Sequence, residues 1–292
     1  MRYTLLIIAC LMSVNMMEAQ RRGGYYSQNE SPTHEFSVYG FGGLSSLNYK
    51  LSEGGTKSGG AGVGAGIGYT FNISDSWGIA TGGEISSAGS KATYGSLSGE
   101  YEYGTPGTWE HFRFHYSQNG YEEQQKVTLF SVPVMLQFKT LLGSSAHFYL
   151  SGGFKIGLPV SARATVSPGT VTTSGEFSYE QIEYRSIEEY GFVTGMPLGK
   201  TESSIDLGIS AALALETGVR FSLNDNVALY TGVFLDYGLN DVRSTKDRHV
   251  TGYQIATPST FVHGSVLNSA LTDKANIFAT GVKIKISFGR AN

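Results

Sequence analysis

Residues 61–71 read AGVGAGIGYTF, and the pattern of this segment is the clearest indication of the fold. Apolar side chains occupy every odd position from Ala61 to Phe71, whereas glycine or threonine occupies every even one. Because successive side chains of a strand point to opposite faces, this period of two predicts a β-strand with one apolar face and one nearly bare face. A glycine-rich dinucleotide-binding loop would instead break the strand and open a helix.

The same alternation recurs along the whole chain. Phe130, Val132 and Val134 face one way, for example, while Ser131, Pro133 and Met135 face the other. We predict eight strands, at about 35–47, 60–72, 77–92, 126–140, 146–160, 204–222, 226–240 and 274–289. After the N-terminal region, the chain has no run of about 18 apolar residues, the length that a transmembrane helix needs.

The connections between these strands alternate in length. Tight turns rich in Asn, Asp, Ser and Gly stand at 72–76, 140–145 and 223–226, and long connections stand at 48–59, 93–125, 161–203 and 241–273. An up-and-down outer-membrane barrel needs this order, with short turns and both ends periplasmic and long loops outside. The predicted fold is therefore an all-β, antiparallel transmembrane barrel of about eight strands.

The N-terminus has the features of an export signal. Residues 5–14 (LLIIACLMSV) form an apolar run that follows Arg2 and is too short to span a bilayer as a helix. We predict a signal peptide at 1–20, a periplasmic segment at 21–33 and the barrel domain at 34–292. Cys10 lies inside the apolar run in a poor context for lipidation, so the mature chain is expected to have no cysteine.

Aromatic side chains gather beside the short turns. The set comprises Tyr69, Phe71, Trp77, Phe138, Phe148, Phe221 and, near the C-terminus, Phe288. Aromatic rings favour the membrane interface, so these residues are expected to form a periplasmic girdle around the barrel.

One strand carries a family resemblance. Residues 122–138 (EEQQKVTLFSVPVMLQF) run from a charged stretch into a strand with Pro133 in its middle, and residues 188–192 read EEYGF. These patterns, with a signal ending in Ala19-Gln20, resemble outer-membrane β-barrel proteins of the Bacteroidetes group. The resemblance covers essentially the mature chain.

The resemblance implies a small OmpA/OmpX-like barrel in the outer membrane. It implies contact with outer-membrane lipid and lipopolysaccharide, and insertion by the barrel-assembly machinery. Some relatives carry a peptidoglycan-binding domain after the barrel, and here the sequence stops at Asn292, so no such domain is expected. Phe288 lies four residues before the end, whereas assembly signals usually place an aromatic residue last.

The inward faces of the predicted strands carry nine charges. An eight-stranded barrel is just wide enough for side chains to fill it, and buried charges must be paired. We therefore predict a salt-bridge network that plugs the lumen. Its members are Glu35, Glu84, Glu216, Asp236, Lys139, Lys155, Arg220, Lys283 and Lys285. The alternative is a narrow ion path, which would make the protein a small channel or a transport-associated barrel.

The long connections are rich in aromatic residues. The candidate surface contacts are Tyr101, Tyr103, Trp109, Phe112, Tyr116, Tyr179 and Tyr184. Two interpretations stay open: these rings contact an extracellular protein or glycan, or the strands extend beyond the membrane as a ribbon that cross-strand tyrosine pairs stabilise.

Catalysis has weak support in the sequence. His115 and His263 each stand two residues before a serine, Ser117 and Ser265, a spacing that would suit a lipid A-modifying barrel enzyme. The chain shows no metal motif, phosphate loop or other cofactor signature, and its net charge of −3 gives no reason to expect a nucleic-acid partner. The prediction is a non-enzymatic structural or surface-interaction barrel.

Overall fold

A computed structural model describes residues 33–104, 111–143, 146–177, 182–224, 226–254 and 260–289. The predicted signal peptide and segment 21–32 lie outside these ranges, as do Trp109 and Tyr179. The strands are β1 (His34–Asn48), β2 (Thr56–Gly59), β3 (Ala61–Asn72), β4 (Trp77–Gly104), β5 (His111–Leu141), β6 (Ala146–Ser167), β7 (Thr170–Phe177), β8 (Ile182–Arg185), β9 (Met196–Pro197), β10 (Thr201–Ser204), β11 (Ser210–Ser222), β12 (Val227–Gly238), β13 (Thr251–Gln254), β14 (Thr260–His263) and β15 (Asn276–Gly289). Two 3₁₀ helices, η1 (Glu188–Tyr190) and η2 (Val266–Asn268), lie between them. No helix among the described residues has the length and apolar character to cross a membrane.

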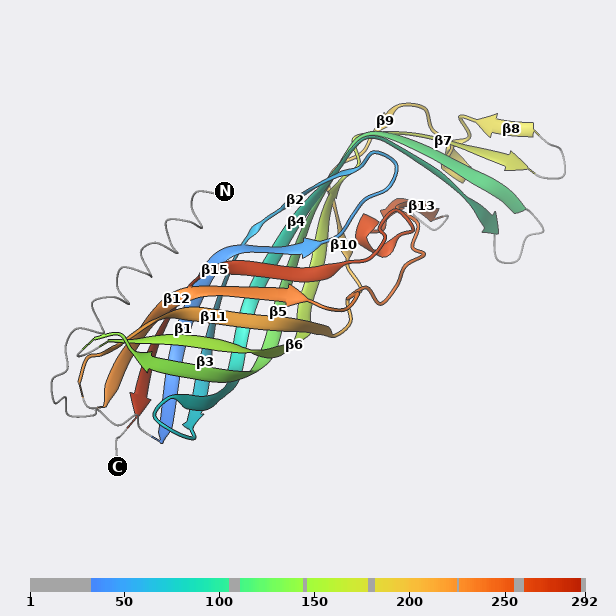
Figure 1. Ribbon diagram of the computed structural model, residues 1–292. Coiled ribbons are helices and arrows are strands. Elements are labelled where there is room, and N and C mark those ends of the chain that lie inside the picture. Colours follow the sequence, from blue (N-terminus) through green and yellow to red (C-terminus); the bar gives the residue numbers. More distant parts are fainter. Residues whose placement is uncertain are drawn as a thin grey trace.

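Eight of these strands close into a barrel (Figure 1). Going round the ring, β1, β3, β4, β5, β6, β11, β12 and β15 each pair antiparallel with the next, and β15 pairs with β1 to complete the circle. The prediction of an antiparallel eight-stranded barrel is confirmed. Closure leaves no free sheet edge in the wall, as a membrane-spanning sheet requires.

The outer wall of the barrel is apolar. Val63 and Ile67 of β3 are 70% and 67% exposed, although both are large hydrophobic residues. Each of the other seven barrel strands also has exposed, large hydrophobic side chains. Near the short turns, Trp77 packs on Phe138 with ring centroids 5.0 Å apart. A band of exposed apolar side chains with aromatic residues at one end is the surface that lipid contacts.

Two strands are far longer than the sequence predicted. β4 has 28 residues and β5 has 31, so most of the segment expected as the 93–125 loop is paired β-structure. β7 and β8 add to the free edge of β5, and Figure 1 shows these four strands reaching away from the barrel. The ribbon interpretation of the long connections is therefore the correct one for β4 and β5. Polar residues replace the lipid-facing apolar ones beyond the membrane, so the composition there is that of a loop.

β11 begins later than predicted, at Ser210 rather than near 204. The alternation continues through Leu207 and Ile209, but the backbone there leaves the barrel ladder. Leu207 forms a bridge with Arg243, and the Gly208 N–H donates to the Val242 carbonyl. Competing pairing with the connection after β12 thus overrides the local pattern.

Candidate functional site

The glycine face of β3 makes room for aromatic rings in the lumen. A Cβ atom on Gly64 would lie 2.3 Å from Cζ of Phe41, and one on Gly66 would lie 2.7 Å from Cζ of Tyr39. Phe41 in turn meets Phe234 edge-on, with ring centroids 5.3 Å apart. The glycines of β3 therefore leave space for the rings of Tyr39 and Phe41, which extend from the neighbouring strand β1 into the lumen.

Nearest the extracellular mouth, one lysine bridges two acids. Lys155 Nζ lies 2.6 Å from Glu84 Oε1 and 2.6 Å from Asp236 Oδ2. The hydroxyl of Tyr39 also donates to Glu84, at 3.3 Å. The two ion pairs of Lys155 therefore connect three strands on different sides of the barrel: β4, β6 and β12.

In the middle of the lumen, one acid serves two lysines. Glu216 accepts from Lys283 at 2.8 Å and from the Tyr149 hydroxyl at 2.9 Å, and Lys285 Nζ lies 4.0 Å from it. The two ammonium groups also lie over aromatic faces: Lys283 is 4.1 Å from the Tyr39 ring centre and Lys285 is 4.2 Å from that of Tyr230. Cation–π contacts supplement the shared carboxylate.

Nearest the periplasm, Glu35 is the centre of a third cluster. It accepts from the Tyr230 hydroxyl at 2.8 Å and from Asn72 at 3.0 Å, and Lys139 Nζ lies 3.4 Å away. Arg220 donates to Ser222 at 2.8 Å and lies 5.8 Å from the Tyr230 ring centre, and it has no carboxylate within 4.0 Å among the described residues.

All nine charged residues predicted for the lumen thus lie inside the barrel, in three stacked clusters. Two cavities among these clusters, lined by Lys155, Glu84 and their neighbours, have volumes of about 30 and 10 Å³. Such spaces hold about one water molecule or a few more. Around these two cavities the lumen contains the paired side chains of the described residues.

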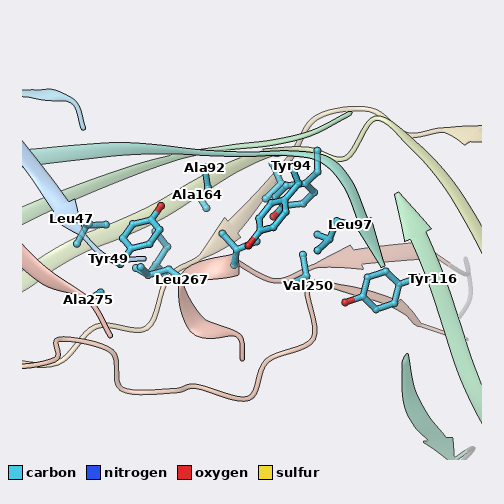
Figure 2. Packing of buried hydrophobic residues seen from close by; sticks show 14 of the residues in the cluster. Leu47, Tyr49, Ala92, Tyr94, Leu97, Tyr116, Ala164, Val250, Leu267 and Ala275 are labelled. Carbon is cyan, nitrogen blue, oxygen red and sulfur yellow. The ribbon is translucent and has the colours of Figure 1, made fainter. Parts of the chain in front are cut away.

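Beyond the membrane, the long connections and the extended strands form an apolar core (Figure 2). Leu47 of β1, Tyr94 and Leu97 of β4, and Val250 and Leu267 from the connection between β12 and β15 belong to the same cluster there. We call this cluster of buried residues the extracellular core. Its members come from β1, β4, β5, β6 and β15 and from the connections that contain η1 and η2.

A buried carboxylate ties the last connection to this core. Glu123 of β5 is fully buried and accepts from the Tyr121 hydroxyl at 2.7 Å, the Gln125 amide at 2.8 Å and the Val266 N–H at 2.8 Å, as well as from the Ser265 hydroxyl. Ser265 caps η2 by accepting from the Leu267 N–H. Glu123 is not among the residues predicted from the sequence, because it lies in a segment expected to be a loop. The alternation Tyr121, Glu123, Gln125 places it on the inner face once β5 is recognised as extending through this segment.

The candidate surface contacts need correction. Phe112 is fully buried and Tyr116 is 9% exposed, so both are residues of the extracellular core and not of the surface. Tyr101, Tyr103 and Tyr184 are half-buried: Tyr101 stacks on His249 at 4.1 Å and Tyr103 on Phe112 at 5.0 Å. Because these residues lie on one face of a sheet, their aromatic rings pack against each other and against the neighbouring connections. In a flexible loop the same rings would have stayed exposed.

The opposite face of the same sheet is polar and open. Ser98, Ser117 and Thr172 stand side by side on β4, β5 and β7, and the next row comprises Glu100, His115, Ser174 and Arg185. These rows border an open groove of about 490 Å³, which we call the polar trough. Its wall is internally bonded: His115 lies 3.3 Å from Glu100 and 3.5 Å from Glu176, and Glu183 accepts from Ser174 at 2.6 Å and from Arg185 at 2.8 Å.

The family assignment follows from residues 26–228, which match the model of the outer membrane protein beta-barrel domain. The chain belongs to this family. This barrel protein therefore resides in the outer membrane, with its long connections outside the cell. No curated protein sequence matches the chain.

Several solved structures resemble the barrel protein. OprG from Pseudomonas aeruginosa is 14% identical, with 91% of this chain and 100% of OprG covered and a TM-score of 0.39. Neisserial surface protein A is 12% identical, with coverages of 89% and 98% and a TM-score of 0.37. Ail of Yersinia pestis is 9% identical, with coverages of 89% and 99% and a TM-score of 0.34.

In the part of the chain that the structure describes, neither histidine–serine pair of the barrel protein is joined by a hydrogen bond, and each residue has other partners or neighbours. Ser265 is fully buried and its hydroxyl donates a hydrogen bond to Glu123, while His263 lies 3.4 Å from Thr251. His115 faces Glu100 and Glu176 across the strands, and Ser117 is opposite Ser98 and Thr172. Within the described ranges, no cluster of three His, Cys, Asp or Glu side chains could hold a metal ion.

Proposed function

We propose that this protein is a non-enzymatic surface-interaction barrel, which holds a rigid β-sheet outside the cell and binds an extracellular protein or glycan on the polar face of that sheet. The observation that carries the proposal is the asymmetry of the sheet formed by β4, β5, β7 and β8. One face is covered by aromatic packing, and the other is bare and contains the polar trough.

The covered face supports the proposal because it makes the open face rigid. Phe112 packs on Phe177 at 5.2 Å and meets Phe192 edge-on at 5.4 Å. A residue at 175 cannot be larger than glycine without displacing Phe192, since a Cβ there would lie 2.1 Å from its ring. A preorganised surface loses less conformational entropy on binding.

The chemistry of the trough favours a polar ligand. Its floor offers the hydroxyls of Ser98, Ser117 and Thr172, which both donate and accept hydrogen bonds. Its wall offers Glu183 and Arg185, both exposed. Groups of this kind can form hydrogen bonds with sugar hydroxyls or with a peptide backbone, whereas an apolar ligand would leave them without partners.

The filled lumen argues against the channel alternative. Lys155, Glu216 and Lys139 each cross the lumen to partners on other strands, so an open path would require several buried ion pairs to break. Breaking a buried pair costs about 3–5 kcal/mol.

The test is a binding screen with a matched pair of variants. Folded protein in detergent is applied to glycan and peptide arrays as wild type, as Ser117→Trp, which fills the trough, and as Gln124→Trp, which places the same ring on an exposed β5 position outside it. We expect saturable binding that Ser117→Trp abolishes and Gln124→Trp leaves intact. Equal binding by both variants, or steady large conductance in planar bilayers, would contradict the proposal.

A further inference from the structure

Two cations face each other on the outer wall of the barrel. Lys126 of β5 and Arg163 of β6 are direct partners in the β5–β6 register, and both side chains are exposed. Like charges directly opposite one another destabilise a strand pair. Neither has a carboxylate within 4.0 Å among the described residues, so the protein itself does not compensate this repulsion.

The nearest acids on the outer surface do not neutralise the pair. Glu122, further along β5, lies 2.8 Å from Lys91, and Asp206 lies 2.7 Å from Arg248. Glu202 of β10 is exposed and stands opposite Thr165, two residues past Arg163, without an ion pair to it. The positive charge of the pair is therefore open to a partner from outside.

The position of the pair along the membrane normal indicates which kind of partner it can bind. On the same face of β5, the apolar residues run from Phe138 at the periplasmic girdle to Phe130, and Lys126 lies 12 positions from Phe138. At about 3.4 Å per residue and a tilt of about 40°, this places Lys126 roughly 30 Å above Phe138. The apolar band of such barrels is about 25 Å tall, so the pair lies at the level of the outer-leaflet headgroups.

A groove next to Arg163 continues this site. It has a volume of about 320 Å³. It lies along the segment of β6 between Gly157, where the pairing with β11 ends, and Arg163, where the pairing with β10 begins. Pro159, Val160, Ile205 and Leu207 supply an apolar lining, and Ser161 and Ser244 supply hydroxyls. Asp206 also lines the groove, and its carboxylate is paired with Arg248 at 2.7 Å. A cation pair beside a partly apolar groove fits an amphiphile that carries a phosphate.

We propose that Lys126 and Arg163 bind a phosphate group of an outer-leaflet glycolipid of the lipid A class, with the glycolipid body lying along the groove at Pro159 and Val160. Guanidinium and ammonium groups form charge-assisted hydrogen bonds with phosphate oxygens. The source is lipid rather than free phosphate, since the pair stands at headgroup height and adjoins an apolar surface. The site is separate from the polar trough and does not depend on the function proposed for it.

The experiment measures glycolipid binding by native mass spectrometry of the folded protein released from detergent. The probes are phosphorylated lipid A, the same lipid A with its phosphates removed, and inorganic phosphate. The variants are Lys126→Gln/Arg163→Gln, the charge-preserving Lys126→Arg/Arg163→Lys, and Arg113→Gln, which removes an exposed positive charge from the sheet far beyond the membrane and outside the polar trough. Mobility on gels before and after heating verifies that each variant is folded.

We expect phosphorylated lipid A to bind the wild type. The Lys126→Gln/Arg163→Gln variant should bind it about 30-fold more weakly, because each cation near an anionic surface contributes a separate attraction. The charge-preserving variant and Arg113→Gln should bind as the wild type does. Equal affinity for dephosphorylated lipid A, inorganic phosphate that competes as well as the lipid, or undiminished binding by Lys126→Gln/Arg163→Gln would each overturn the proposal.

Discussion

Replacing Lys155 by methionine tests whether the lumen charges stabilise the barrel. Methionine keeps the length and apolar stem of the side chain but leaves Glu84 and Asp236 facing each other without the ammonium group that lies 2.6 Å from both. The two acid side chains are 2% and 11% exposed, so water cannot take over this role. Removing one partner of a buried ion pair costs about 3–5 kcal/mol, and Glu84 retains only the Tyr39 hydroxyl. We expect the free energy of unfolding to fall by about 4 kcal/mol.

The assay is equilibrium urea unfolding in lipid vesicles, followed by tryptophan fluorescence. A compensating variant, Glu84→Gln/Lys155→Met/Asp236→Asn, should recover at least half of the loss, because neutral amides leave no uncompensated charge in the lumen. A loss below about 1 kcal/mol for Lys155→Met would show that surrounding solvent already screens the three charges. If the triple variant is no more stable than the single one, packing and not charge is the cause, and the electrostatic reasoning is refuted.

Three other changes test other parts of the fold. Glu123→Ala leaves several buried donors unpaired, so the connection around η2 should detach from the extracellular core. Limited proteolysis would detect this as faster cleavage within 244–275. Unchanged cleavage would show that apolar packing alone holds the connection. Gly66→Leu places a side chain against Tyr39 and should cost about 1–3 kcal/mol or block folding, whereas Ala65→Leu on the lipid face should cost little, both measured by urea unfolding. Burial lowers the pKa of His263 to about 4 from its usual 6.5, so the unfolded hairpin of β13 and β14 takes up a proton that the folded one excludes. Its stability should therefore fall by about 3 kcal/mol as the pH drops from 6.5 to 4 and level off below that, as seen by hydrogen exchange corrected for intrinsic rates; His263→Gln should remove this dependence.

Much of the barrel could be read from the sequence, because each strand carries its own pattern. The period of two in residues 61–71 separates a lipid face from a lumen face without reference to any other strand. For the same reason, Glu35, Glu84 and Lys155 could be assigned to the inside. Which acid meets which base could not be assigned, since Lys155 reaches Glu84 and Asp236 only through the stagger of the closed ring.

The region beyond the membrane was harder to predict, because its pattern depends on what covers each face. Phe112 and Tyr116 read as exposed loop residues, and they are buried because the 186–193 segment and β13 fold back onto the sheet. The same packing leaves Ser98, Ser117 and Thr172 in a row on the open face, where β7 pairs with the edge of the β4–β5 hairpin.

The antiparallel barrel of eight strands, with its long connections on one side, could be predicted from the sequence, because alternation is a property of each strand taken singly. The export signal and the filled lumen remain predictions from the same sequence. The partners inside the lumen, the extracellular core, the polar trough and the pairing of Lys126 with Arg163 depend on register between strands, which the closed ring and the packing of distant segments set together.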